Sequence, residues 1–192
     1  MSYTLEGPSY ALFKMMSLLK SNMSAKLTTL RSEMVTNTAT LAFFSTITSA
    51  IAALMLQNPA SASWLPYYVA IGACSIDLLP IVSMYPLEDD QDGNAHGGVG
   101  QSNHLIICSI FNYYDDLELV RIASEFYVRA VRELAREQMD LSITGISPGG
   151  WDTSKAVYFP VLLGEEEKEE THLIYESQLV FGVLHKETSA WI

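Results

Sequence analysis

Residues His104–Gln138 read HLIICSIFNYYDDLELVRIASEFYVRAVRELAREQ, and this is the most regular part of the chain and the expected centre of its domain. Leu105–Phe111 is apolar at successive positions, which is typical of a strand whose sheet is covered on both faces. A long helix follows, in which apolar residues recur at the roughly 3.6-residue spacing of one buried face. Asp115 or Asp116 is a suitable N-cap between the two elements. The stretch therefore predicts a central strand that runs directly into a long amphipathic helix.

The opposite face of this predicted helix is charged. Glu125 and Arg129 lie four residues apart, a spacing at which opposite charges on a helix stabilise each other. Arg129, Arg132 and Arg136 all lie in the second half of the helix, where the helix dipole favours cations. A solvated face explains this pattern, and an interface with a second protein is the sharper alternative.

The composition is that of one acidic domain. The 192 residues are 49% hydrophobic, which suffices for a sizeable core, and their formal net charge is −11. Such a charge opposes a grip on nucleic acid through its phosphates. Two runs concentrate the acidic residues, Glu88–Asp92 and Glu165–Glu170. Because a run of like charges is usually solvated, we expect long acidic loops at 87–103 and 164–171.

Two helices are expected before the central strand. The first spans 9–34, where apolar residues step by three or four from Leu12 to Met34. The second spans 38–56 and lies within a region, residues 34–76, that contains no charged side chain. We expect it to be buried in the fold or in a subunit interface. A membrane-associated helix over 40–56 is the alternative, although a membrane span needs about 20 mostly apolar residues.

Several further segments have the composition of strands or of turns. Pro160 indicates an edge strand or a break in its strand, because proline cannot donate to a central ladder. A Ser147–Gly150 turn precedes that strand. The predicted strands are Pro66–Ile76, Leu79–Tyr85, a short Leu141–Ile146, Val157–Leu163 and Leu173–Leu184.

No motif for catalysis or cofactor binding is present. The glycines of Gly97–Gly100 lack the lysine and the following helix that a phosphate-binding loop needs. Glu88–Asn94 resembles half of a calcium-binding loop, but Val99 stands where a bidentate glutamate is required. Cys74 and Cys108 both lie in apolar segments and are expected to be free. We therefore predict no catalytic, cofactor or metal site; the alternative is a small enzyme with a site built from loop carboxylates.

The order of the elements matches a known class of virion proteins. It comprises a long N-terminal helix, a strand start at Leu65-Pro66 and the strand-to-helix junction Asn112–Asp116. The turn Ser147–Asp152 and the polar end of the last strand, Val180–Glu187, complete it. In this order the chain resembles the tail terminator and neck (head-to-tail joining) proteins of tailed bacteriophages. The resemblance implies an α+β fold, with a mainly antiparallel sheet packed against two or three helices in a single domain over 1–192.

The same resemblance implies a structural role, without enzymatic activity or cofactor. Copies of the chain, six by expectation, would form a ring at the head-proximal end of a phage tail. The ring would cap the tail tube and join it to the head-completion or connector protein. DNA would pass through the lumen as a non-specific passenger, and no membrane would be involved. The protein would lie in the tail or neck of the virion, and in the host cytoplasm during assembly.

A closed ring needs heterologous interfaces, in which two different surfaces meet. An acidic lumen or loop would repel DNA phosphates and prevent sticking. The expected interface residues are Arg121, Arg129, Arg132, Arg136, Trp191, Phe43 and Phe44. The expected lumen or docking residues are Glu88, Asp89, Asp90, Asp92, Glu165, Glu166, Glu167, Glu169 and Glu170.

Overall fold

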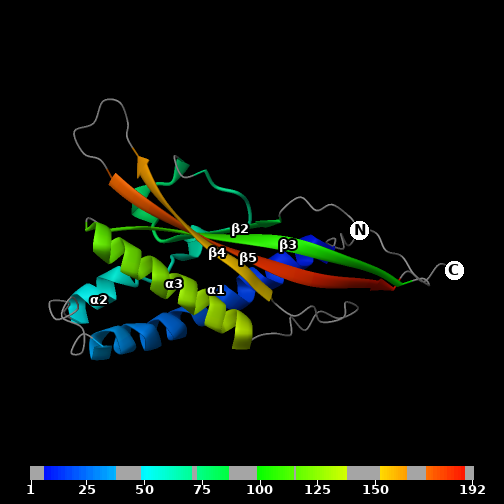
Figure 1. The fold of residues 1–192 in the computed structure, drawn as a ribbon, viewed down its shortest axis with the longest axis horizontal. Coiled ribbons are helices and arrows are strands. Elements are labelled where there is room, and N and C mark those ends of the chain that lie inside the picture. Colours follow the sequence, from blue (N-terminus) through cyan, green and yellow to red (C-terminus); the bar gives the residue numbers. More distant parts are fainter. Residues whose placement is uncertain are drawn as a thin grey trace.

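The computed structural model places helices on one face of a sheet (Figure 1). It describes residues 7–37, 49–70, 73–86, 99–114, 116–137, 152–163 and 172–188. The helices are α1 (Gly7–Asn37), α2 (Ser49–Met55) and α3 (Leu117–Glu137). The strands are β1 (Trp64–Leu65), β2 (Ile81–Pro86), β3 (Val99–Tyr113), β4 (Asp152–Leu163) and β5 (His172–Thr188).

The sheet has the order β1-β2-β3-β5-β4. The short β1 runs parallel to β2, and every other neighbouring pair is antiparallel. This confirms the predicted α+β class with a mainly antiparallel sheet and helices packed against it. Pro160 lies in β4 at one edge of the sheet, as its missing N–H predicts.

Strand β3 occupies the centre of the sheet and is longer than predicted. It pairs with β5 along its whole length, from Val99 opposite Thr188 to Tyr113 opposite Ile174. The predicted loop 87–103 is therefore wrong over residues 99–103. Strand pairing uses backbone groups, so the β5 backbone can extend the ladder into a stretch whose side chains alone indicate a loop.

The main core lies between the helices and the sheet. Helix α1 confirms the predicted helix 9–34, and the regularly spaced apolar residues all face inward. Ile106, Cys108 and Ile110 of β3 point into this core. The buried residues of α1 are Ala11, Leu12, Met15, Met16, Leu19, Met23, Leu27, Leu30 and Met34.

The second face of the sheet carries a smaller core. Phe111 of β3 packs there with Ile81 of β2, Ile174 of β5 and Val69. Both faces of β3 are therefore covered, as its continuous apolar sequence predicts. The cover on this second face comes from the segment between β1 and β2.

That segment was predicted as the strand Pro66–Ile76, and this prediction is wrong. The described part of its backbone does not join the sheet, and the Tyr67 carbonyl instead accepts a hydrogen bond from the Ser83 hydroxyl. The chain then turns, with the Ala73 N–H donating to the Ala70 carbonyl at 2.9 Å. Of the described residues between α2 and β2, only Trp64 and Leu65 pair with β2. A segment rich in strand-forming residues thus covers the sheet instead of extending it.

Helix α2 accounts for the end of the predicted helix 38–56. It spans Ser49–Met55, and residues 38–48 lie outside the described residues. Ala52 and Met55 are buried, but Leu54 is exposed. One face of α2 is therefore covered and another faces solvent. Within the residues that the structure describes, no helix is long and apolar enough to span a membrane.

Helix α3 begins where the sequence predicts. The Asp116 carboxylate accepts a hydrogen bond from the Leu119 N–H at 3.1 Å, which makes Asp116 the N-cap. Further along, the Tyr127 side chain is 1% exposed and its hydroxyl donates to the Gln57 carbonyl at 2.8 Å. The same hydroxyl lies 3.3 Å from the Met55 carbonyl. Tyr127 therefore holds the C-terminal end of α2 against α3.

We predict that Tyr127→Phe destabilises the protein by about 1 to 2 kcal/mol, because it leaves buried carbonyls without their donor. Urea unfolding followed by circular dichroism measures the change. Tyr68→Phe is the control, since the Tyr68 ring is largely exposed. Equal stability of the Tyr127 variant and the native chain would contradict this role.

Candidate functional site

The outer face of α3 carries a shallow groove of about 400 Å³. We call it the arginine groove. Three of the four predicted interface arginines line it, with buried Val128 at its base. Arg121 lies on the same helix and is exposed, but it is not part of the groove. The groove residues are Glu125, Val128, Arg129, Arg132, Glu133 and Arg136.

Arg129 is held in place by two carboxylates. Its guanidinium lies 2.8 Å from Glu33 of α1 and 2.7 Å from Glu133, one turn further along α3. The sequence predicts Glu125, four residues before Arg129, as its partner. The structure instead pairs Arg129 with Glu133, four residues after it. The hydrogen bond with Glu133 raises the pKa of Arg129, and the same contact lowers the pKa of Glu133.

A second cation neutralises the same region. Lys26 of α1 lies 3.4 Å from Glu133 and also forms an ion pair with Glu137, which raises the pKa of Lys26. The carboxylate of Glu133 is therefore shared by two cations. These contacts also show that α1 and α3 run antiparallel, because Lys26 meets the end of α3 and Glu33 meets its middle.

Arg132 and Arg136 are placed differently from Arg129. Among the described residues, no carboxylate forms an ion pair with either guanidinium. Arg136 is exposed, and Arg132 is half-buried. The groove thus offers two cations that are available to a carboxylate or another anion from outside.

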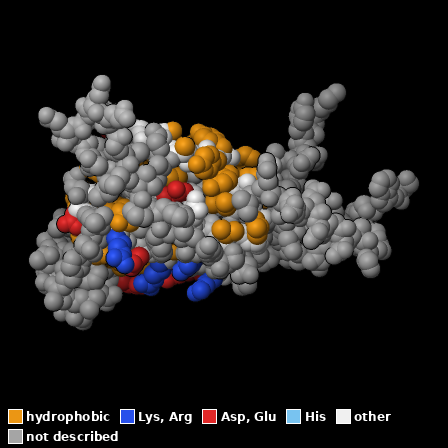
Figure 2. Space-filling model, turned by 45° about the horizontal axis from the view of Figure 1, so that its top comes forward, with side chains coloured by type: hydrophobic (Ala, Val, Ile, Leu, Met, Phe, Trp, Pro, Cys, Tyr) orange, Lys and Arg blue, Asp and Glu red, His pale blue; other side chains and the backbone are white. Residues whose placement is uncertain are grey.

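A second surface lies on the other side of the sheet. Tyr67 and Tyr68 are 56% and 62% exposed, and Leu78 is 44% exposed. The rings of Tyr68 and Tyr85 meet edge to face, with their centroids 5.3 Å apart. We call Tyr67, Tyr68, Leu78 and Tyr85 the aromatic surface. Figure 2 shows hydrophobic side chains gathered on this side, and Lys and Arg along the lower edge.

The aromatic surface was not predicted from the sequence. The segment was interpreted as a strand buried on both faces, which would have hidden both tyrosines. One signal was present: Pro66 directly precedes two consecutive tyrosines. Proline at this point interrupts strand pairing, and a cover segment that lies flat exposes the polar ends of its tyrosines.

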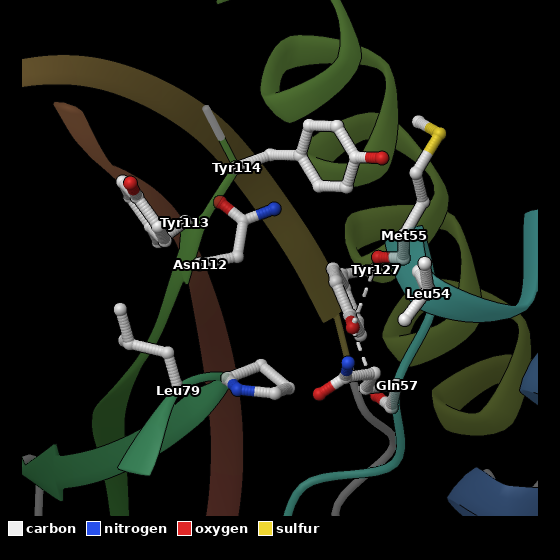
Figure 3. A pocket seen from close by; sticks show the side chains of 9 residues that line it. Leu54, Met55, Gln57, Leu79, Asn112, Tyr113, Tyr114 and Tyr127 are labelled. Carbon is white, nitrogen blue, oxygen red and sulfur yellow. Dashed lines mark hydrogen bonds between the residues drawn. The ribbon is translucent and has the colours of Figure 1, made fainter. Parts of the chain in front are cut away.

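A cavity of about 300 Å³ lies between α2, α3 and the ends of β2 and β3 (Figure 3). Its polar groups already serve the fold. The Tyr127 hydroxyl binds the end of α2, and the Asn112 amide donates to the Val120 carbonyl at 3.4 Å. The Ser124 hydroxyl lies 3.0 Å from the Asn112 side-chain oxygen. These hydrogen bonds commit the Tyr127, Asn112 and Ser124 side chains to the fold.

The remaining candidates for chemistry are two thiols. Cys108 lies in the main core, and Cys74 lies on the opposite side of the sheet, so they are free and apart. Burial raises the pKa of Cys108 to about 12 and that of Cys74 to about 11. Both thiols are thus protonated at neutral pH. Among the described residues, no group of three or more His, Cys, Asp or Glu could hold a metal ion.

The other predicted site residues lie outside the residues that the structure describes. They comprise the aromatic interface candidates Phe43, Phe44 and Trp191, and the acidic lumen or docking candidates Glu88, Asp89, Asp90, Asp92, Glu165, Glu166, Glu167, Glu169 and Glu170.

Comparison with known proteins identifies no relative: no protein-family model matches the chain, and no curated protein matches it.

We predict that Glu133→Gln lowers the free energy of unfolding by up to about 1 kcal/mol at neutral pH, since the lost ion pairs are partly exposed. Because the pKa of Glu133 is lowered below its ordinary value of 4.5, its contribution is present above that value. It is lost as the pH falls through the lowered pKa. The difference between native chain and variant should therefore shrink on acidification, in thermal unfolding at several pH values. Glu125→Gln serves as control, and a difference that grows on acidification would contradict the assignment.

Proposed function

We propose that this chain is a structural virion protein that forms a ring at the head-proximal end of a bacteriophage tail. In this role it caps the tail tube on one side and joins it to the head-completion or connector protein on the other. DNA passes through the lumen without being held. The protein acts in the virion and has no catalytic activity.

One observation carries this proposal: the molecule presents two contact surfaces of different kind on opposite sides of its sheet. The arginine groove lies on the outer face of α3, which covers one side. The aromatic surface lies over the other side. A ring forms when one surface of each copy meets a different surface of the next, so a ring subunit needs two unlike surfaces. Exposed tyrosines and arginines are the residues most enriched at protein interfaces.

The charge of the chain supports the same role. A formal net charge of −11 repels DNA phosphates, so a passing duplex is not retained. The junction between β3 and α3, on which the phage resemblance chiefly rests, has the capping aspartate that the resemblance expects. The mainly antiparallel sheet with helices on one face is also the fold that the resemblance implies.

We predict that the purified chain forms closed rings with a hole of DNA width. Sedimentation velocity gives the mass, and negative-stain electron microscopy gives the symmetry. A chain that remains monomeric, both alone and with tail tube protein, would refute the proposal.

The aromatic surface should be required for this assembly. Tyr67→Ser with Tyr68→Ser is expected to leave a folded monomer, because it removes apolar contact area that the fold itself does not bury. Phe13→Ser is the matched control: it removes another exposed aromatic side chain, on α1. Circular dichroism verifies folding. Rings that form equally well from the double tyrosine variant would exclude this surface from the interface.

A further inference from the structure

We infer that the arginine groove of one copy binds the acidic run Glu165–Glu170 of the next copy. The inference rests on the proposed ring and names the partner of one of its two surfaces. The occupant is thus a second copy of this chain, held by contacts between guanidinium groups and carboxylates.

The charges of the groove call for an acidic occupant. Glu133 is neutralised by Arg129 and Lys26, while Arg132 and Arg136 have no carboxylate partner among the described residues. The lining has three arginines and two glutamates, a net charge of +1, and the two arginines without a partner among the described residues lie one turn apart. Guanidinium groups bind carboxylates through paired hydrogen bonds, which gives such a site geometric as well as electrostatic selectivity.

The fold separates the acidic run from the groove within one copy. The run lies between Leu163 and His172, which are paired across β4 and β5. That pair lies at the end of the sheet where α3 begins, since Tyr113 of β3 is opposite Ile174 of β5 (Figure 1). The acidic run therefore leaves the sheet at the start of α3, whereas the groove arginines lie toward its end.

Chain length then excludes contact within one copy. Along the helix axis, Arg132 lies about 22 Å from Leu117, and Arg136 lies about 28 Å from it. A connection of eight residues, anchored at both ends, extends no more than about 14 Å from its anchors. The arginine and glutamate side chains add about 11 Å to this reach, which still leaves Arg136 out of range, so only another molecule can bring the acidic run to both arginines. Opposite charges at opposite ends of one subunit favour a head-to-tail arrangement, which gives a ring when the rotation between copies closes.

The other acidic run is a poorer partner for this argument. Glu88–Asp92 follows Pro86, which is opposite Ile106 of β3, and precedes Val99. It therefore leaves the sheet toward the end to which α3 runs. Chain length does not separate this run from the groove within one copy, so it does not require a neighbour.

The test uses the full-length chain and reverses charge in the groove. Arg132→Glu with Arg136→Glu should raise the dissociation constant of the assembly by about tenfold or more, measured by sedimentation velocity over a concentration series. The matched control is Lys14→Glu with Lys20→Glu, which changes the net charge equally and leaves the groove intact. This control should assemble like the native chain.

A charge swap then identifies the occupant. Glu166→Lys with Glu167→Lys should weaken assembly on its own, and should restore it when combined with the groove variant. Circular dichroism verifies that each variant folds; if the groove variant does not, Arg132→Gln with Arg136→Gln replaces it.

The outcomes separate the two proposals. A native chain that stays monomeric refutes both the ring and this contact. A native chain that forms rings, with a groove variant that forms them equally well, refutes the contact alone. If the groove variant loses assembly and the combined charge-swap variant does not regain it, the groove binds something other than Glu165–Glu170. The same follows if the groove variant forms rings but no longer binds tail tube protein.

Discussion

The rest of the structure depends on the need to cover both faces of β3. Ile106, Cys108 and Ile110 point to one side of the sheet, and Phe111 points to the other. A strand that is apolar on both faces is stable only between two layers. The helices form the first layer, and the segment between β1 and β2 forms the second. Each layer turns its remaining polar or aromatic side chains outward, and these side chains make up the two surfaces on which assembly is proposed.

Most of the fold follows from local sequence. The bounds of α1 and α3 were predicted to within three residues, and an aspartate cap at 115 or 116 and an edge or break at Pro160 were predicted too, because each depends on spacing or on one residue's own chemistry. The cover segment was not, since strand-forming residues suit a covering layer as well as a strand. The covering position includes a contact that local sequence does not predict: the Ser83 hydroxyl of β2 donates a hydrogen bond to the Tyr67 carbonyl.

The candidate site was predicted in part, for the same reason. Arginines on the outer face of α3 follow from helical spacing, and three of the four form one groove. Their partners do not follow from it: Glu33 reaches Arg129 only because α1 packs antiparallel to α3. Contacts between elements depend on how the elements pack, and sequence spacing within one helix contains no information about that packing. The acidic residues of the two runs remain predictions.

The length of the β3–β5 pairing has a mechanical consequence. The 15 residues of β3 are matched along their whole length by antiparallel β5, which gives a ribbon of about 50 Å. Cross-strand hydrogen bonds lie perpendicular to the strands, so tension that slides β3 along β5 loads all of them together. Under such a pull the ribbon resists as one unit, whereas the helical layer is joined to it by side-chain packing and by the few hydrogen bonds that Asn112 makes with α3.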